Sequence, residues 1–195
     1  MLISHQNLSD CIRTAKNIAD AYRLKVPNGH NASRRSLDVL LDVCVEACQH
    51  PIEIYKGDFD ENDRWLYGAC LLAEDKAVVL YAHYLNSCWE RFTVCKELFH
   101  VVLDKEEYRS MDIFQHIQNI TLSFPDDESR PTGPVVCEFL AEVAAMEFLF
   151  PYAERKAILA ANAMTPAEVA EQYKVPCLMV EKYLSHDYMD KLKDA

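Results

Sequence analysis

Hydrophobic residues recur with helical spacing along most of the chain. Apolar side chains three and four positions apart predict two long inner helices, at residues 87–104 and 135–150. The stretch 87–104 is apolar on nearly every side, which is typical of a helix at the centre of a domain. Ser87 and Glu90 have the spacing of a capping box at its start. The other helices predicted in this way cover residues 9–25 (capped by Ser9 or Asp10), 36–48, 106–122, 152–163, 165–173 and 176–185.

In one part of the chain, residues 52–81, hydrophobic residues recur at every second position instead. Alternation of this kind predicts short strands, and small polar residues mark the turns between them. The predicted strands cover residues 52–55, 65–72 and 77–81, with a hairpin connection at 73–77. We therefore expect an α+β fold that is mostly helical and carries a small three-stranded antiparallel sheet. Residues 123–134, rich in proline, are predicted to be a loop.

The central predicted helix carries charged residues among its apolar ones. Lys96, Glu97 and His100 lie there, and buried charges are costly unless they are paired or bind a metal. Residues 96–100 (KELFH) differ by one residue from the motif H-E-x-x-H. That motif holds zinc with two imidazoles and uses the Glu as general base. On the second inner helix, Glu138 and Glu142 are four positions apart, so both carboxylates project from one face.

The neighbouring residues extend this pattern. Arg91-Phe92-Thr93 precedes the motif, and Glu138, Ala141 and the segment 148–151 (FLFP) follow it. In these segments the chain resembles the ImmA/IrrE family of zincin-like metallopeptidases, whose pattern is R-F-T-x-x-H-E-x-x-H followed by E-x-x-A-N. The resemblance implies a zincin-like domain at residues 1–151 and a helix-turn-helix-like helical segment at residues 152–195.

The same resemblance assigns roles to the charged residues. It places Glu97 at the position of the catalytic Glu, His100 at the second His ligand and Glu138 at the Glu ligand. Lys96 stands where the family has its first His ligand, so the zinc motif is degenerate. Glu142 stands where the family has Asn.

Lys96 changes what such a site can do, because a working zinc site needs three protein ligands and an open position for water. An ammonium about 4 Å from the metal adds repulsion of about 4 kcal/mol per unit of metal charge. Neutralising the Lys instead costs about 4–5 kcal/mol before any metal bond forms. We therefore expect no cofactor, and an ammonium that replaces the zinc and pairs with Glu138 and with Glu97 or Glu142.

Three functions remain open at this point. The first is a pseudo-metallopeptidase that acts as a protein-binding or regulatory module, with a groove edge at residues 78–81. The alternative is an active zinc-dependent metallo-endopeptidase whose missing ligand comes from Glu142, His83 or His116. The resemblance implies that its substrate would be a repressor-type regulator of a phage or mobile-element switch. The third is a structural domain in which Lys96 extends to solvent.

One more residue belongs to the candidate site. Asp104 lies one turn beyond His100. It is a candidate to orient the imidazole ring from behind, as carboxylates do in metal sites. An exposed carboxylate at the end of the helix is an equally good interpretation of Asp104.

Charge and composition narrow the class of partner. The 195 residues carry a formal charge of −11, which argues against a general binder of nucleic acid or anionic membranes. Residues 165–195 contain four Lys and no Arg against six Asp and Glu, so we expect no nucleic acid and a protein partner instead. The eight Cys form no C-x-x-C pair, and no signal segment or bilayer-spanning run is evident. We expect a cytoplasmic protein with reduced thiols and no membrane partner.

Overall fold

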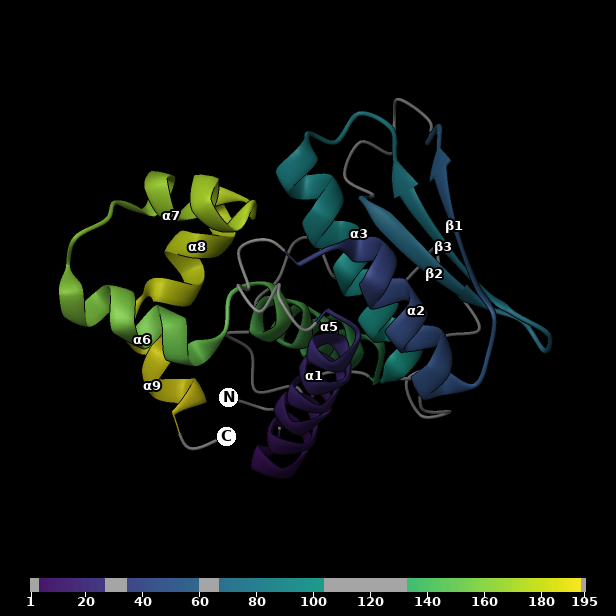
Figure 1. Cartoon of the computed structure of the whole chain (residues 1–195), viewed down its shortest axis with the longest axis horizontal. Coiled ribbons are helices and arrows are strands. Elements are labelled where there is room, and N and C mark those ends of the chain that lie inside the picture. Colours follow the sequence, from purple (N-terminus) through teal and green to yellow (C-terminus); the bar gives the residue numbers. More distant parts are fainter. Residues whose placement is uncertain (1–3, 27–34, 60–66, 104–132, 194–195) are drawn as a thin grey trace.

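The computed structural model describes residues 4–26, 35–59, 67–103 and 133–193 (Figure 1). The helices are α1 (His5–Lys25), α2 (Leu37–Cys48), α3 (Ser87–Val102), α5 (Gly133–Leu149), α6 (Tyr152–Ala161), α7 (Pro166–Tyr173), α8 (Cys177–Leu184) and α9 (His186–Leu192). The strands are β1 (Ile52–Gly57), β2 (Gly68–Leu72) and β3 (Ala77–Ala82). The α+β prediction with mostly helical content is confirmed. The predictions made for residues 106–122 and 123–132 lie outside the described ranges.

Helix α3 lies at the centre, as its apolar sequence predicts. It contacts α5 and α2 and also β2 and β3, and half of its residues are buried. Its start differs from the prediction, because Asn86 is the N-cap and Ser87 the first helical residue. The Asn86 side chain accepts the backbone N–H groups of Cys88 and Trp89 at 3.1 and 3.0 Å. An Asn cap satisfies the same orphan amides as a Ser cap, so the sequence alone did not separate the two.

The sheet is mixed, so the expectation of an antiparallel sheet is wrong for one of its two pairings. The strand order is β1-β3-β2, with β3 parallel to β1 and antiparallel to β2. The chain enters β2 on the far side of β3 and returns through the predicted hairpin, where Ala73 N–H bonds to the Lys76 carbonyl at 2.9 Å. Alternating hydrophobic residues reveal a strand, but they do not show which strand pairs with it or whether that pairing is parallel. The parallel pairing of β1 with β3 was missed for this reason.

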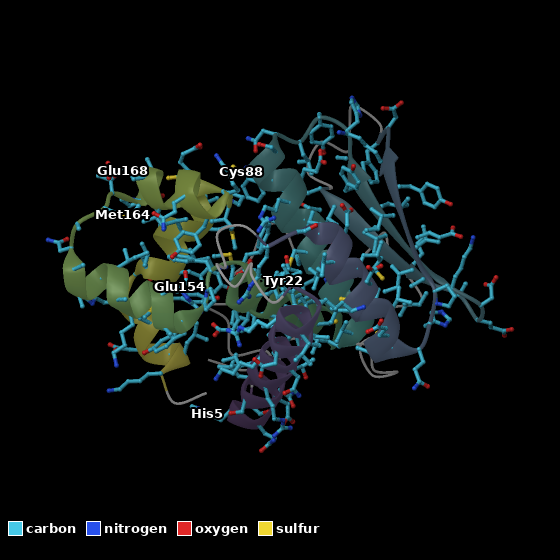
Figure 2. The ribbon with its side chains drawn as sticks, in the orientation of Figure 1. His5, Tyr22, Cys88, Glu154, Met164 and Glu168 are labelled. Atoms are coloured by element: carbon cyan, nitrogen blue, oxygen red, sulfur yellow. The ribbon has the colours of Figure 1, made fainter. Side chains whose placement is uncertain are left out.

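Helices α1 and α5 pack against each other and complete the core. Tyr22 of α1, near the middle of the molecule in Figure 2, meets the Phe148 ring of α5 edge-on at 5.5 Å. Its hydroxyl accepts the Ser36 backbone N–H at 2.7 Å, which fixes the start of α2 against α1. Buried aromatic pairs of this geometry contribute about 0.5–1.5 kcal/mol beyond their buried area.

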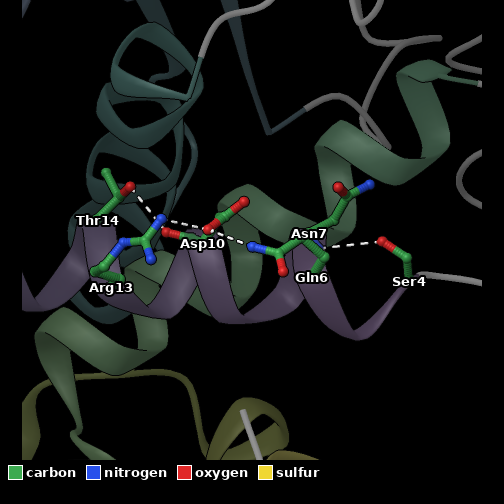
Figure 3. A network of polar contacts seen from close by, with 6 residues as sticks. All are labelled: Ser4, Gln6, Asn7, Asp10, Arg13 and Thr14. Atoms are coloured by element: carbon green, nitrogen blue, oxygen red, sulfur yellow. Dashed lines mark hydrogen bonds and ion pairs between the residues drawn. The ribbon is translucent and has the colours of Figure 1, made fainter.

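Helix α1 begins earlier than the sequence predicts. Ser4 caps it by accepting the Asn7 backbone N–H at 3.1 Å, so the expected caps Ser9 and Asp10 lie inside the helix (Figure 3). Asp10 instead accepts a hydrogen bond from Gln6 Nε2 at 2.9 Å and pairs with Arg13. The extra turn buries Leu8, which explains why the helix continues toward the N-terminus.

Helices α6 to α9 form a separate group beside α5, away from the sheet (Figure 1). Thr165 and Glu168 form a reciprocal capping box at the start of α7. Helix α9 was not predicted; Ser185 ends α8 and caps α9 by accepting the Tyr188 backbone N–H at 3.3 Å. No described helix is both long and apolar enough to cross a membrane.

Candidate functional site

The candidate site lies between α3 and α5, which pack side by side. Lys96, Glu97 and His100 project from α3, and Cys137 and Glu138 project from α5. The structure therefore brings together, at one place, the four residues that the degenerate motif and its downstream Glu single out. Each is at least partly buried: the side chain of Glu97 is 3% exposed and that of His100 is 11% exposed.

The Lys96 ammonium is shared by two carboxylates. Its Nζ donates a hydrogen bond to Glu138 Oε2 at 2.6 Å and lies 3.3 Å from Glu97 Oε1. The second contact is an ion pair whose angles fall outside hydrogen-bond geometry, because Glu97 Oε1 makes no hydrogen bond within the described part of the chain. The side chain of Lys96 is 20% exposed and that of Glu138 is 32% exposed. The ammonium thus occupies the space between the carboxylates of Glu97 and Glu138.

His100 is held from both sides of its ring. Nε2 lies 3.1 Å from Glu138 Oε1, again as an ion-pair contact rather than an aligned hydrogen bond. Nδ1 lies 3.3 Å from Cys137 Sγ. Both carboxylate oxygens of Glu138 therefore face cations, one the ammonium and the other the imidazole.

These contacts shift the pKa values of Lys96, His100 and Glu138 so that the charged form of each group is favoured. Burial alone would lower the pKa values of Lys96 and His100, but the charges of Glu138 and Glu97 outweigh it. The pKa of Lys96 is raised above its usual range, and that of His100 is raised to about 10. Burial raises the pKa of Glu138, but Lys96 and His100 together lower it well below its ordinary value. At neutral pH, Lys96 and His100 are therefore cationic and Glu138 is anionic.

The residues present do not fit a zinc ion. Within the described ranges no group of three or more His, Cys, Asp or Glu side chains is placed to hold a metal. Zinc accepts lone pairs at about 2.0–2.2 Å from nitrogen and oxygen ligands. The Nε2 of a protonated His100 carries a hydrogen, and both oxygens of Glu138 face cations.

The residues considered as substitute ligands lie elsewhere or are not described. Glu142 turns toward α8, where its Oε1 accepts hydrogen bonds from Lys182 Nζ at 2.6 Å and from the Tyr183 hydroxyl at 3.0 Å. The suggested pairing of Lys96 with Glu142 is therefore not found. His83 pairs with Asp58 at 2.8 Å, just beyond β3 and in an exposed position. The remaining two candidates, His116 and Asp104, lie outside the described residues.

Two residues of the site were not singled out from the sequence. Cys137 was treated only as one of several scattered thiols, although its position next to Glu138 places it on the same turn of α5. Gly68, at the start of β2, borders the site closely: a Cβ there would lie 2.5 Å from Thr93 Cγ2 and 3.1 Å from Glu97 Cγ. No pattern in the sequence connects Gly68 with α3, since the contact depends on how the sheet packs.

Comparison with models of known protein families gives a match. The family model of the IrrE N-terminal-like domain, Peptidase M78, matches residues 47–185, from the end of α2 to the end of α8. The match covers more than two-thirds of the chain and includes both helices of the candidate site. No curated protein matches the sequence.

Proposed function

Because the chain belongs to the family of IrrE N-terminal-like domains, we propose that it is a pseudo-metallopeptidase that acts as a protein-binding or regulatory module. The expected partner is a repressor-type regulator, the class of protein that enzymes resembling this chain cut. The observation that carries the proposal is the position of the Lys96 ammonium, 2.6 Å from Glu138 and 3.3 Å from Glu97.

The cluster has a structural role that explains why it persists without a metal. One ammonium and one imidazolium neutralise two carboxylates, and their contacts with Glu138, at 2.6 and 3.1 Å, join α3 to α5. The charge-assisted hydrogen bond from Lys96 to Glu138 is about twice as strong as a neutral one. A carboxylate that is held by an ammonium is also a poor acceptor for a proton from water, which supports the loss of the general-base role of Glu97.

An open strand edge supports the binding role. The groove edge expected at residues 78–81 belongs to β3, which is paired on both sides and cannot accept another strand. Among the described strands, β2 is paired only with β3, and Gly68 at its start borders Glu97. An extended peptide can add to such an edge by main-chain hydrogen bonds. Leu71 and Leu72 of β2 are 42% and 38% exposed and offer apolar contacts to such a peptide.

The test combines binding and cleavage. The purified chain, supplied with zinc, is incubated with repressor-type regulators from its host, and binding is followed by calorimetry and cleavage by mass spectrometry. We expect binding without cleavage, and loss of binding in Leu71→Asp. The matched control is Leu24→Asp, which adds the same charge at a residue of α1 that is 83% exposed. Cleavage that requires zinc and Glu97 would refute the proposal and establish the metallo-endopeptidase alternative.

A further inference from the structure

A second feature, unrelated to the Lys96 cluster, is a small cavity between α1 and the junction of α5 with α6. Its volume is about 230 Å³, and it is partly open to solvent. Charged groups dominate its lining, which includes Lys16, Asp20, Arg23, Arg35 and Glu147. This concentration of cations is unexpected in a chain whose formal charge is −11.

Arg35 is the unusual member of the cavity. It is only 2% exposed, yet it forms no ion pair with any carboxylate of the described residues. Its Nη1 donates to the Phe148 carbonyl, and its guanidinium lies 4.7 Å from the centre of the Phe148 ring. A backbone carbonyl and an aromatic face only partly replace a counter-ion, because a buried charge is costly until an opposite charge pairs with it.

A second buried guanidinium, that of Arg91, adds to the uncompensated positive charge near Arg35. Arg91 of α3 donates from Nη1 to the Arg35 carbonyl. Its Nε and Nη2 are buried and have no hydrogen-bond partner in the described part of the chain. Arg91 lies in the first turns of α3, and no described carboxylate pairs with it.

The two carboxylates of the cavity do not compensate for these charges. Asp20 pairs with Arg23 on the next turn of α1. Glu147 pairs with buried Arg155 and also accepts the Tyr152 backbone N–H at 3.0 Å. Lys16 has no ion pair with any described residue. Among the described residues, Lys16 and Arg35 are therefore the two cations of the lining that have no partner of opposite charge.

The electrostatics of Arg35 agree with this geometry. Burial lowers its pKa, and the positive charge of Arg23 lowers it further, while Glu154 of α6 acts in the opposite sense. Both guanidinium groups line the same cavity, so their positive charges oppose each other there. An anion between them would replace that repulsion by two charge-assisted contacts.

We infer that this cavity binds a small phosphate-type dianion, either inorganic phosphate or the phosphate group of a small phosphomonoester. Guanidinium forks match the oxygens of phosphate, and Lys16 supplies a third cation at the rim. The volume of about 230 Å³ is below that of typical ligand pockets, so it suits an oxyanion with little attached to it. The site depends only on α1, Arg35 and the α5–α6 junction, and hence on neither zinc nor the peptidase question.

The experiment measures phosphate affinity at constant ionic strength by calorimetry, with thermal unfolding as a second readout. Inorganic phosphate and glycerol 3-phosphate are the two probes, and tighter binding of one identifies the source of the phosphate group. Arg23→Gln and Lys16→Gln change exposed residues and should each weaken binding about tenfold. Asp20→Asn removes a competing anion and should strengthen binding.

The matched control is Arg13→Gln. Arg13 lies on the same helix and pairs with Asp10 as Arg23 pairs with Asp20, but it does not line the cavity. The affinity of the Arg13→Gln variant for phosphate should equal that of the unmodified chain. The inference is overturned if neither probe binds, or if Arg13→Gln weakens binding as much as Arg23→Gln does.

Discussion

Replacing Lys96 by Met tests whether the ammonium stabilises the junction of α3 and α5. Met has a similar length and fills the same space but carries no charge. The substitution removes the cation 2.6 Å from Glu138 and 3.3 Å from Glu97. Glu97, with a side chain only 3% exposed, then has no cation in contact among the described residues.

The magnitude follows from opposing contributions. At an effective dielectric near 20, unit charges separated by 2.6 and 3.3 Å attract by about 6 and about 5 kcal/mol. Burial of the ions offsets most of this attraction, and removing one partner of a buried pair costs about 3–5 kcal/mol. Because the side chains of Lys96 and Glu138 are 20% and 32% exposed, solvent screens part of the effect. We expect a loss of about 3 kcal/mol, at the lower end of that range.

Urea unfolding followed by circular dichroism measures this loss. Adding Glu97→Gln to Lys96→Met removes the buried charge left without a partner, and the double variant should recover about half of the stability. Lys56→Met is the matched control, because Lys56 pairs with Glu90 at 3.1 Å but in an exposed position; its stability should be unchanged. A free energy of unfolding for Lys96→Met within about 0.5 kcal/mol of the unmodified chain would refute the reasoning.

Three further outcomes are expected. The pKa of His100 is raised from 6.5 to about 10, so its contribution is complete below the lower value and lost as pH rises through the higher one. The pKa of Glu138 is lowered from 4.5, so the contribution of Glu138 to stability is lost as pH falls below this value. The cluster is thus most stabilising between pH 4.5 and pH 6.5, the ordinary pKa values of the two groups. His100→Gln should therefore reduce the loss of stability at alkaline pH that urea unfolding measures. Gly68→Ala should cost about 1–3 kcal/mol by overpacking, whereas Gly57→Ala, which meets only the Phe59 ring at 3.9 Å, should not lower the melting temperature. Glu142→Gln should weaken the attachment of α8 by about 1 kcal/mol and speed limited proteolysis there.

The sequence predicted the parts of the fold that depend on local pattern. Helix α3 is apolar on most sides and α5 even more so, and such long uninterrupted patterns leave little alternative to buried helices. The placing of Lys96 and His100 on one face of α3 could be predicted because the spacing within a helix is fixed. Glu138, forty-two positions beyond Lys96, was assigned to the same site only through the family resemblance. The hairpin between β2 and β3 was likewise visible in its turn residues.

The sequence did not predict what depends on packing between distant segments. The parallel pairing of β1 with β3 needs the strand order, which alternation does not contain. Glu142 looked like a member of the site because it lies one turn after Glu138 on α5. Lys182 and Tyr183 of α8 hold it instead, and these contacts exist only once the C-terminal helices have docked. The cavity at Arg35 had no motif at all, because its residues come from three separate segments of the chain: α1, Arg35 and the junction of α5 with α6.

The central claim is that the ammonium of Lys96 has taken the place of a zinc ion. Elemental analysis of the protein, purified without chelators from zinc-supplemented cells, tests it most directly. We expect far less than one zinc in the unmodified chain and about one in Lys96→His, which restores three ligands. About one zinc per unmodified chain, lost on Glu138→Ala, would contradict the account and show that a metal site survives.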